Sequence, residues 1–427
     1  MTKAIFALVV AVFAAVVVIM PAPAAQQAGP TAAVNPPSVS VCPVDEGSGR
    51  NTTVAVAATV DGVGQFTAFA GGASAGSAPF ETGASGAVAI PLLDVAPTGV
   101  AAGLVELPGG EAASASLVVG TESVAFESCL TTPAQQTLLA GGSTTSGQEF
   151  DVQLMNPYSG EALVDLTVVS ESGIESATQL RAIAVPSRSS VVIDMDELLP
   201  GRESLSVTIE TSIGSVMAAG RLTSGTDSAL WSAVAPAPDW FVPIPAGGGQ
   251  VVISSGVATD VQYQVDLYGG DGLVEAFQAG VVPARGLSVV DVGAGDGGAS
   301  AIRVVSTQSV AVFLRNVGEG GVALTTGSTV AAARWLHPGA GLAPGGTGRM
   351  VLLNPGLDEA TVTVSSAGEA PAEQDIVVPA GTVVEFPAME GAADAYTLSG
   401  QGALVSLWVT TTGTASAYST GVPLVDE

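Results

Sequence analysis

The only histidine of the chain, His337, is the one side chain whose ordinary pKa lies near neutrality, so it is the one candidate for a general base. It stands beside Pro338 at a predicted domain boundary, which favours a packing or surface role. A single histidine also excludes metal sites that are built from several histidines. We therefore predict no catalytic residue in this chain.

Two short glycine motifs match functional signatures, but their surroundings do not fit the chemistry. Residues 72–76 match G-x-S-x-G, the hydrolase nucleophile elbow, which requires a strand before it, a helix after it and a histidine base. The motif instead lies in a Gly/Ala/Ser-rich stretch, 70–86, that we expect to be a loop insertion. Gly293, Gly295 and Gly298 match G-x-G-x-x-G. A strand is predicted after them, so no helix N-terminus would hold a pyrophosphate.

The 39 acidic residues form no recognisable metal-binding or catalytic pattern. The best clusters of oxygen ligands, at 194–197 and 269–272, lack the spacing of a known Ca²⁺ loop. Paired carboxylates could serve glycoside hydrolysis. Such enzymes hold sugars with aromatic rings, however, and only 5% of the chain is aromatic. We predict no metal and no cofactor, and a glycoside hydrolase-type enzyme is the remote alternative.

Trp240 and Trp335 begin two W-x-x-P motifs, which also contain Phe241 and His337. Both motifs fall at predicted domain junctions. Each indole could be a wedge buried between consecutive domains, or the two could form a repeated platform on which sugar rings stack. We expect the wedge, because the junction position explains both tryptophans without a ligand.

Cys42 and Cys129 are the only cysteines of the chain. In an exported protein an even number of cysteines favours a disulfide over a metal or thiol site. Closing so long a loop stabilises a fold by about 4 kcal/mol in the chain-entropy account. We therefore predict a Cys42–Cys129 disulfide, whose reduction would destabilise the first domain alone.

The first 25 residues differ in composition from the rest of the chain. Lys3 is followed by an apolar run over 4–20 and a Pro/Ala-rich end at 21–25. The pattern is typical of a secretory signal peptide, and the run is also just long enough to stay as a membrane anchor. Both alternatives place the body of the protein outside the membrane, either secreted or held at the cell envelope.

The formal net charge of −28 results from a shortage of basic residues, since 11 Lys and Arg face 39 Asp and Glu. Binding to DNA, RNA or anionic lipid requires clustered basic side chains, so nucleic acid is excluded as a partner. An envelope protein or a neutral glycan is compatible with this charge.

Short motifs recur in a constant order along the chain and indicate about four repeats of a small domain. Val-Pro steps recur at 185–186, 282–283 and 378–379. Asn-Pro steps lie two such periods apart, at 156–157 and 354–355, with the segment 251–256 midway between them. Ser-Val steps at 123–124, 215–216 and 309–310, and Leu-Pro-Gly at 107–109 and 199–201, connect the first repeat to the series.

Within each repeat the pattern is that of short β-strands. Residues 164–168 and 360–364 alternate in the period-two manner of a strand with one buried face. Residues 191–193 and 302–305 are β-branched runs. The 54 glycines and 26 prolines leave no room for a long amphipathic helix, although one helical turn is expected at 196–199.

The fold class that this pattern predicts is all-β: a tandem array of about four immunoglobulin-like β-sandwich domains after an N-terminal signal or anchor helix. A four-bladed β-propeller-like arrangement is the alternative. The predicted segments are 1–25 (signal peptide or anchor), 26–132 (a diverged domain with the disulfide), 133–239, 240–333 and 334–427.

A few short motifs carry a resemblance to a known group of proteins. They are Val41-Cys42-Pro43, the L-x-N-P variants at Leu154 and Leu353, and the V-P-A steps at 282–284 and 378–380. In these the chain resembles uncharacterised secreted or membrane-anchored cell-envelope proteins of high-GC actinobacteria, made of repeated β domains. The resemblance implies an envelope location and no catalytic residues.

Two classes of function follow from these observations. The first is a non-catalytic exported cell-envelope protein that acts as a structural spacer or protein-interaction scaffold. The alternative is a carbohydrate-binding accessory module for envelope polysaccharide. The first class predicts buried tryptophans, and the second predicts a concave face where Trp, Tyr and Asp side chains converge.

Overall fold

The computed structural model describes residues 39–424 with ten short gaps, and residues Pro36–Val425 form one compact unit. Strands account for 68% of the structure and helices for 3%, which confirms the all-β prediction. Within the described part of the chain, no helix is both long and apolar enough to cross a membrane. The predicted signal peptide or anchor, 1–25, lies outside the described residues. The gaps are 46–48, 71–72, 84–86, 97–99, 108–110, 294–297, 319–320, 344, 369–370 and 390–392.

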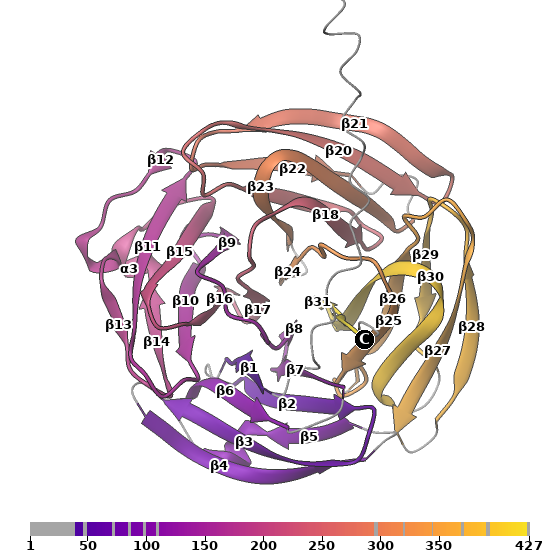
Figure 1. Ribbon diagram of the computed structural model, residues 1–427, viewed down its shortest axis with the longest axis horizontal. Helices are drawn as coiled ribbons and strands as arrows, with labels where there is room; N and C mark the ends of the chain where they lie inside the picture. Colours follow the sequence, from indigo (N-terminus) through magenta and orange to yellow (C-terminus); the bar gives the residue numbers. More distant parts are fainter. Residues whose placement is uncertain are drawn as a thin grey trace, which may run out of the picture. The chain divides into compact units, whose positions relative to one another are not determined.

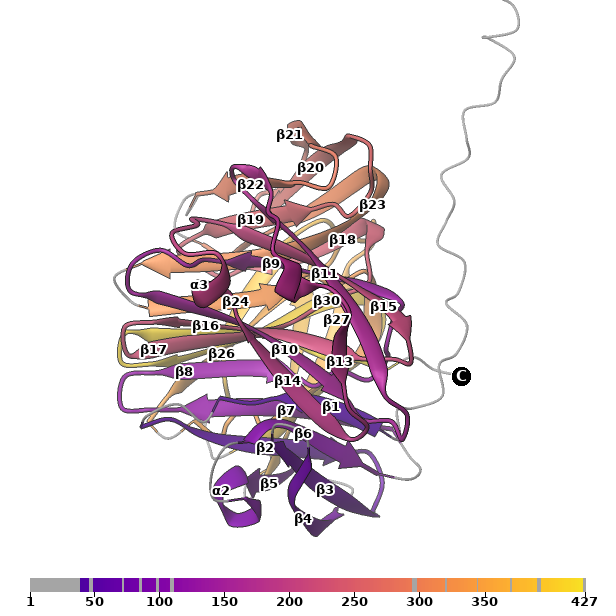
Figure 2. The ribbon, with the colours of Figure 1, turned by 90° about the vertical axis from the view of Figure 1, so that its left-hand side faces the viewer.

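The strands form pairs of antiparallel sheets that repeat one strand order along the chain (Figures 1 and 2). We call them sheet pair 1 (39–128), sheet pair 2 (136–232), sheet pair 3 (237–326) and sheet pair 4 (332–423). In each pair, the first, sixth, third and fourth strands are neighbours in one sheet, and the fifth, second, seventh and eighth in the other. The same topology four times explains why the sequence motifs recur in order.

Sheet pair 1 contains one short helix, α2 (Leu92–Val95), and eight strands. These are β1 (Val39–Pro43), β2 (Asn51–Ala58), β3 (Gly62–Ala70), β4 (Ala73–Thr82), β5 (Ala87–Pro91), β6 (Val100–Glu106), β7 (Ala112–Val119) and β8 (Val124–Ser128).

Sheet pair 2 divides its fourth strand into two short pieces and contains two helical turns, η1 (Thr178–Leu180) and α3 (Met195–Leu198). Its strands are β9 (Gln136–Gly142), β10 (Gln148–Asn156), β11 (Ala162–Ser170), β12 (Gly173–Ile174), β13 (Ile183–Val185), β14 (Ser189–Asp194), β15 (Leu205–Ile213), β16 (Met217–Ser224) and β17 (Asp227–Ser232).

In sheet pairs 3 and 4 the sixth and seventh strands are continuous, so β23 and β30 each take part in both sheets of their pair. Sheet pair 3 consists of β18 (Ala237–Ile244), β19 (Gly249–Ser254), β20 (Val261–Gly269), β21 (Gly272–Val282), β22 (Leu287–Val292), β23 (Ser300–Gly318) and β24 (Gly321–Thr326). Sheet pair 4 consists of β25 (Ala332–Pro338), β26 (Thr347–Leu353), β27 (Ala360–Gly368), β28 (Glu373–Val378), β29 (Val383–Pro387), β30 (Ala393–Thr412), β31 (Ala415–Thr420) and β32 (Val422–Pro423).

The two sheets of a pair enclose an apolar core. In sheet pair 1, Val54 on β2 and Phe66 on β3 belong to one buried cluster, although they lie on different sheets. On β11 and β27, buried residues alternate with more exposed ones, as the period-two pattern predicts. The single helical turn expected after residue 195 is α3, where the side chain of Asp194 accepts a hydrogen bond from the backbone N–H of Glu197.

The eighth strands of the four pairs form a closed ring. β8 contacts β17, β17 contacts β24, β24 contacts β31, and β31 returns to β8 (Figure 1). One apolar cluster contains buried residues of sheet pairs 1, 3 and 4, among them Phe126, Val312 and Leu407. The sheet pairs therefore combine the sandwich-like sheets of the expected array with the closed circle of the propeller-like alternative.

The recurring Asn-Pro motif marks a connection between strands. The Asn156 side chain donates to the carbonyls of Gly160 (2.8 Å) and Val185 (3.1 Å), and the Asn354 side chain donates to Asp358 (2.8 Å) and Val378 (2.9 Å). Each buried amide thus fastens the turn after the second strand to the Val-Pro step. The Asn-Pro and Val-Pro motifs recur together because the asparagine side chain of the first donates a hydrogen bond to the valine carbonyl of the second.

Two sequence expectations for sheet pair 1 were wrong. The stretch 70–86 contains a strand, β4, which pairs with β3 along the sheet edge; its Ala, Gly and Ser residues hid the apolar alternation. The Ser-Val step at 123–124 lies at the start of the eighth strand, whereas those at 215–216 and 309–310 precede or begin the seventh. The Leu-Pro-Gly step at 107–109 extends outside the described residues.

Candidate functional site

His337 lies on β25 inside sheet pair 4 and is 1% exposed. Its Nε2 atom is 2.7 Å from the hydroxyl oxygen of Ser406. Burial disfavours the charged imidazolium and lowers the pKa of His337 to about 3. The side chain is therefore neutral at physiological pH and has no contact with solvent, so it is a buried packing residue.

Trp240 and Trp335 occupy the same position on β18 and β25, and both are buried. Each indole Nε1 donates to two backbone carbonyls of its own sheet pair at 2.8–3.1 Å; the acceptors are Ala237 and Val310 for the first and Ala332 and Leu404 for the second. Neither indole offers a face on which a sugar could stack. Phe241 is partly buried, with the guanidinium of Arg303 5.5 Å from its ring centroid.

The remaining motifs have structural positions. Ser74 of the G-x-S-x-G match is exposed on the edge strand β4, and Gly295 of the G-x-G-x-x-G match lies outside the described residues. Asp196 accepts a hydrogen bond from the backbone N–H of Phe150 at 3.0 Å. In the described part of the chain, no group of three His, Cys, Asp or Glu side chains is placed to hold a metal ion.

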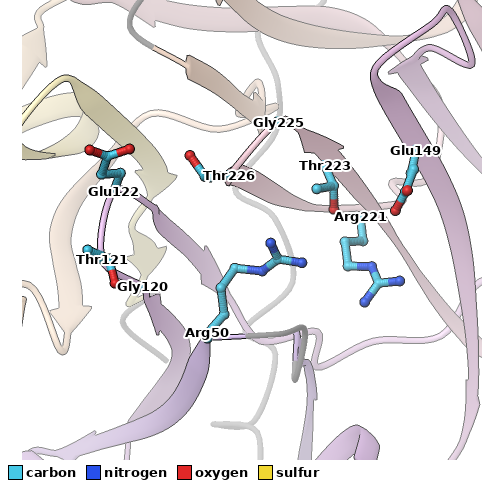
Figure 3. A pocket seen from close by; sticks show the side chains of 10 residues that line it. Arg50, Gly120, Thr121, Glu122, Glu149, Arg221, Thr223, Gly225 and Thr226 are labelled. Carbon is cyan, nitrogen blue, oxygen red and sulfur yellow. The ribbon is translucent and has the colours of Figure 1, made fainter.

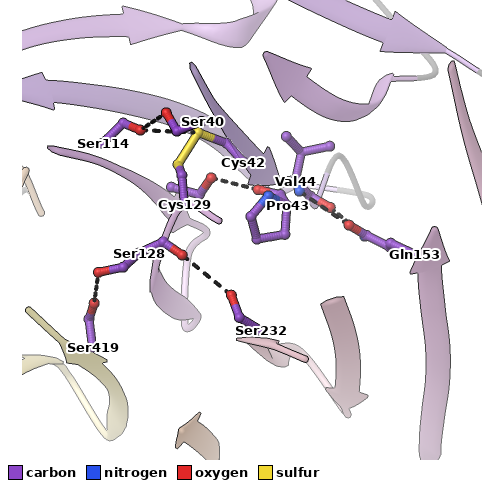
Figure 4. The surroundings of a disulfide bond; sticks show 11 residues. Ser40, Cys42, Pro43, Val44, Ser114, Ser128, Cys129, Gln153, Ser232 and Ser419 are labelled. Carbon is purple, nitrogen blue, oxygen red and sulfur yellow. Dashed lines mark hydrogen bonds between the residues drawn. A yellow bond between two sulfur atoms is a disulfide. The ribbon is translucent and has the colours of Figure 1, made fainter. Parts of the chain in front are cut away.

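The predicted Cys42–Cys129 disulfide is present and joins β1 to the residue after β8 (Figure 4). Neighbouring side chains connect sheet pair 1 to two other pairs. The side-chain amide of Gln153 in sheet pair 2 donates a hydrogen bond to the backbone carbonyl of Val44 at 2.8 Å. The hydroxyl oxygen of Ser128 lies 3.2 Å from the hydroxyl oxygen of Ser419 in sheet pair 4. The disulfide therefore anchors the place where three sheet pairs meet.

A cavity of about 580 Å³ lies between sheet pairs 1 and 2, at the turns that connect β7 to β8 and β16 to β17 (Figure 3). Its volume is typical of small-molecule sites, which enclose roughly 300–1,000 Å³. All ten lining residues are Gly, Thr, Arg or Glu. Two of the chain's few arginines, Arg50 and Arg221, point into it side by side (Figure 3).

Both guanidinium groups are held by one buried carboxylate. Asp45 is completely buried and accepts from Arg50 Nε at 2.7 Å and from Arg221 Nη1 at 3.0 Å. Arg221 also forms an ion pair with Asp151. Asp45 belongs to sheet pair 1 and Arg221 to sheet pair 2, so this ion-pair cluster fixes the cavity wall and connects the two pairs.

Two exposed carboxylates complete the charge of the cavity. Glu122 lies on the β7–β8 turn and Glu149 on β10, and Figure 3 shows them on opposite sides of the guanidinium groups. Arg50 and Arg221 are already balanced by Asp45 and Asp151. The cavity therefore carries two uncompensated negative charges and also presents hydrogen-bond donors.

Two acidic residues of the central ring are buried. Glu127 on β8 accepts a hydrogen bond from the backbone N–H of Ser232 on β17 at 3.0 Å, and burial raises its pKa to about 8. Asp227 on β17 accepts from the backbone N–H groups of Val124 and Val322, and burial raises its pKa as well. These carboxyl groups join neighbouring eighth strands.

Sequence reasoning did not find the cavity. Arg50 and Arg221 are far apart in the chain and share no motif, so no local spacing connects them. The sequence feature that points to these two residues is the scarcity of basic side chains, because in so acidic a chain each arginine is expected to have a specific ion-pair or binding role. The sequence could not show that two of them converge.

Comparison with known proteins gives a family and no activity. A family model described as "Family of unknown function (DUF5719)" matches residues 113–389, which include all of sheet pairs 2 and 3. No curated protein matches the chain.

Solved structures with some similarity are only distantly alike. One is a viral chemokine binding protein, R17, encoded by rodent gammaherpesvirus Peru, with 11% identity, coverage of 70% of this chain and 88% of that one, and a TM-score of 0.17. A tetra-tandem repeat from the extending region of a large adhesion protein has 11% identity, coverage of 90% and 99%, and a TM-score of 0.12. The Bacteroides ovatus protein SGBP-B, in complex with a mixed-linkage heptasaccharide, has 12% identity, coverage of 92% and 98%, and a TM-score of 0.15. Scores this low support no argument about fold or function.

Proposed function

Since the chain belongs to the DUF5719 family, whose function is unknown, we propose a role from its geometry: an exported, non-catalytic protein of the cell envelope that acts as a rigid scaffold for protein interactions. The observation that carries this proposal is the closed ring of β8, β17, β24 and β31. A ring whose pairs share buried residues cannot lengthen or bend like a string of separate domains. It presents surfaces of four sheet pairs in fixed relation to one another.

The location rests on the disulfide and the N-terminal pattern. A Cys42–Cys129 bond across sheet pair 1 persists in oxidising compartments outside the cytoplasm. The apolar run over 4–20 supplies an export signal, which is either removed or kept as a membrane tether. The strongly acidic composition favours partners with basic or neutral surfaces.

The non-catalytic part of the proposal rests on the side chains that could perform chemistry. The only histidine is buried and neutral, so it cannot exchange protons with a substrate at the surface. Glu127, which has a pKa raised to about 8, lies 3% exposed inside the central ring. Perturbed carboxyl groups are common in active sites, but this one is enclosed between strands.

The test is cross-linking in the native envelope, followed by reconstitution. Proteins cross-linked to the chain are identified, purified and mixed with the full chain, and a specific complex of defined stoichiometry is expected. Failure to reconstitute any complex would contradict the scaffold role. Turnover of envelope polysaccharide or peptide by the purified chain would contradict the non-catalytic part.

A further inference from the structure

We propose that the cavity between sheet pairs 1 and 2 is a binding site for a neutral polyhydroxylated ligand, such as a short oligosaccharide. This inference does not depend on the scaffold proposal, because it concerns a small-molecule site and not a protein surface. It also differs from the tryptophan platform considered from the sequence, since the cavity contains no aromatic residue.

No described residue that lines the cavity has a large apolar side chain. Almost half of the chain is hydrophobic, yet the residues around this cavity are only Gly, Thr, Arg and Glu. Most small-molecule sites owe their affinity to apolar walls with a few polar groups. A cavity with entirely polar side chains offers hydrogen bonds instead, and it suits a ligand that is covered with hydroxyl groups.

The two guanidinium groups supply N–H donors that none of the described residues accepts from. Hydrogen bonds to Asp45 and Asp151 account for three of the five N–H groups of Arg221, and bonds to Asp45 account for two of the five of Arg50. The others have no protein acceptor among the described residues. Arginine N–H groups in a fixed fork bind paired oxygen atoms well.

The remaining groups accept hydrogen bonds and repel anions. Glu122 and Glu149 provide carboxylate oxygens, and three threonines provide hydroxyl groups that both donate and accept. Because Asp45 and Asp151 already neutralise the arginines, the cavity is negative overall, as is the chain at −28. A carboxylate or phosphate ligand would be repelled by this negative charge. A neutral polyol would instead form hydrogen bonds with both the donors and the acceptors of the cavity.

The site is held in place before any ligand arrives. The Asp45 side chain is 0% exposed, and those of Arg50 and Arg221 are 12% and 26% exposed, so both guanidinium groups are already held by ion pairs before binding. The threonine at 226 lies on an exposed turn at the cavity edge, after Gly225, whose φ of +60° fits the left-handed region. Binding therefore costs little conformational entropy, which favours affinity for a ligand that fits the site.

The experiment is saturation-transfer NMR with the purified full chain. The probes are neutral disaccharides of glucose, galactose and mannose, tested beside counterparts that carry a uronate or a phosphate group. We expect at least one neutral disaccharide to bind with a Kd on the order of 1 mM, and its charged counterpart at least tenfold more weakly. Preference for the charged sugars, or no binding of any neutral probe at 10 times that concentration, would overturn the proposal.

Matched variants locate the site. Replacing either arginine by alanine would remove one of the two ion pairs of the buried Asp45 and destabilise the chain, so Thr226→Trp is used to fill the cavity from its edge. Thr414→Trp is the control, because Gly413-Thr414 forms the equivalent turn of sheet pair 4, with a φ of +61° at its glycine. Thr226→Trp should weaken saccharide binding at least tenfold, and Thr414→Trp should not. Equal binding by both variants would refute this site.

A second variant separates geometry from charge. Arg50→Lys keeps the positive charge beside Asp45 but loses the planar fork of N–H donors. It should weaken saccharide binding at least fivefold while the chain still unfolds cooperatively. Unchanged binding in Arg50→Lys would mean that the guanidinium is not part of the site.

Discussion

The Oδ2 atom of Asp227 lies 2.9 Å from the backbone nitrogen of Val322, and this bond joins the central strands of sheet pairs 2 and 3. The other carboxylate oxygen, Oδ1, accepts from the backbone N–H of Val124 on β8 at 3.3 Å. One buried side chain therefore connects three of the four central strands. A side chain on Gly321 would collide with this carboxylate, which explains the glycine before Val322.

Asp227→Ala should lower the free energy of unfolding by about 2–4 kcal/mol, because it leaves two buried backbone N–H groups without an acceptor. Urea unfolding followed by circular dichroism measures the change. Asp375→Ala, at an exposed carboxylate bonded to Thr363, is the control and should change stability by less than about 0.5 kcal/mol. Equal effects of the two substitutions would show that the ring does not depend on Asp227.

Reducing the Cys42–Cys129 disulfide should destabilise the whole ring. The loop that it closes predicts a loss on the order of 4 kcal/mol. Because β8 contacts β17 and β31, the loss should spread over all four sheet pairs and not stay within the first, as the sequence alone suggested. Hydrogen exchange with and without reductant measures protection strand by strand. Loss of protection confined to residues 39–129 would favour independent domains.

Glu127 should make the protein less stable as the pH rises. Its pKa is about 8 in the folded chain and near 4.5 in the unfolded chain, so between these values the folded state holds a proton that the unfolded state has lost. Its contribution to stability is complete below pH 4.5 and disappears as the pH rises through 8. Glu127→Gln keeps the acceptor for Ser232 and should be more stable than the parent chain at pH 8 by a few kcal/mol.

The comparison of Glu127→Gln with the parent chain requires a low-pH reference. At pH 4 the two chains should unfold at similar urea concentrations, because Glu127 is then protonated in both states. Chemical denaturation at pH 4, 6 and 8 gives the curve. A constant difference between the two chains at all three values would contradict the buried, protonated carboxyl group.

His337 should remain neutral well below its ordinary pKa. Burial lowers its pKa to about 3 from a usual 6.5, so acidification within this window favours the unfolded state, which binds the proton. Stability attributable to His337 is therefore present above pH 6.5 and is lost as the pH falls toward 3. Because the chain has one histidine, its ring NMR signals need no assignment, and they should not titrate between pH 5 and 8. A midpoint near 6.5 would show that the ring is exposed.

Small-angle X-ray scattering should show a compact particle. A globular body of the length of Pro36–Val425 has a radius of gyration of about 21 Å. The closed circle of central strands requires a value near this for Pro36–Val425. A linear string of four domains would give a clearly larger radius and maximum dimension, and that outcome would contradict the ring.

The sequence by itself determined the local structure. Period-two alternation identified β11 and β27, the spacing of Val-Pro and Asn-Pro steps identified the repeat, and the even number of cysteines indicated the disulfide. These inferences succeed because each depends on residue types and their spacing, which can be read along the chain without knowing how the strands pack. They fail where small residues mask the alternation, as in β4.

Only the tertiary structure decided how the repeats are joined and where a site lies. The ring is made by contacts between strands far apart in the chain, and its closing contact joins β31 to β8, where Ser128 and Ser419 are 291 residues apart. The same apolar strand patterns suit both a linear array and a closed circle. The cavity depends on Asp45, Arg50 and Arg221, which meet because two sheet pairs pack side by side. His337 likewise carries no sign of burial in its own segment; its neutral state results from burial among the strands that enclose it.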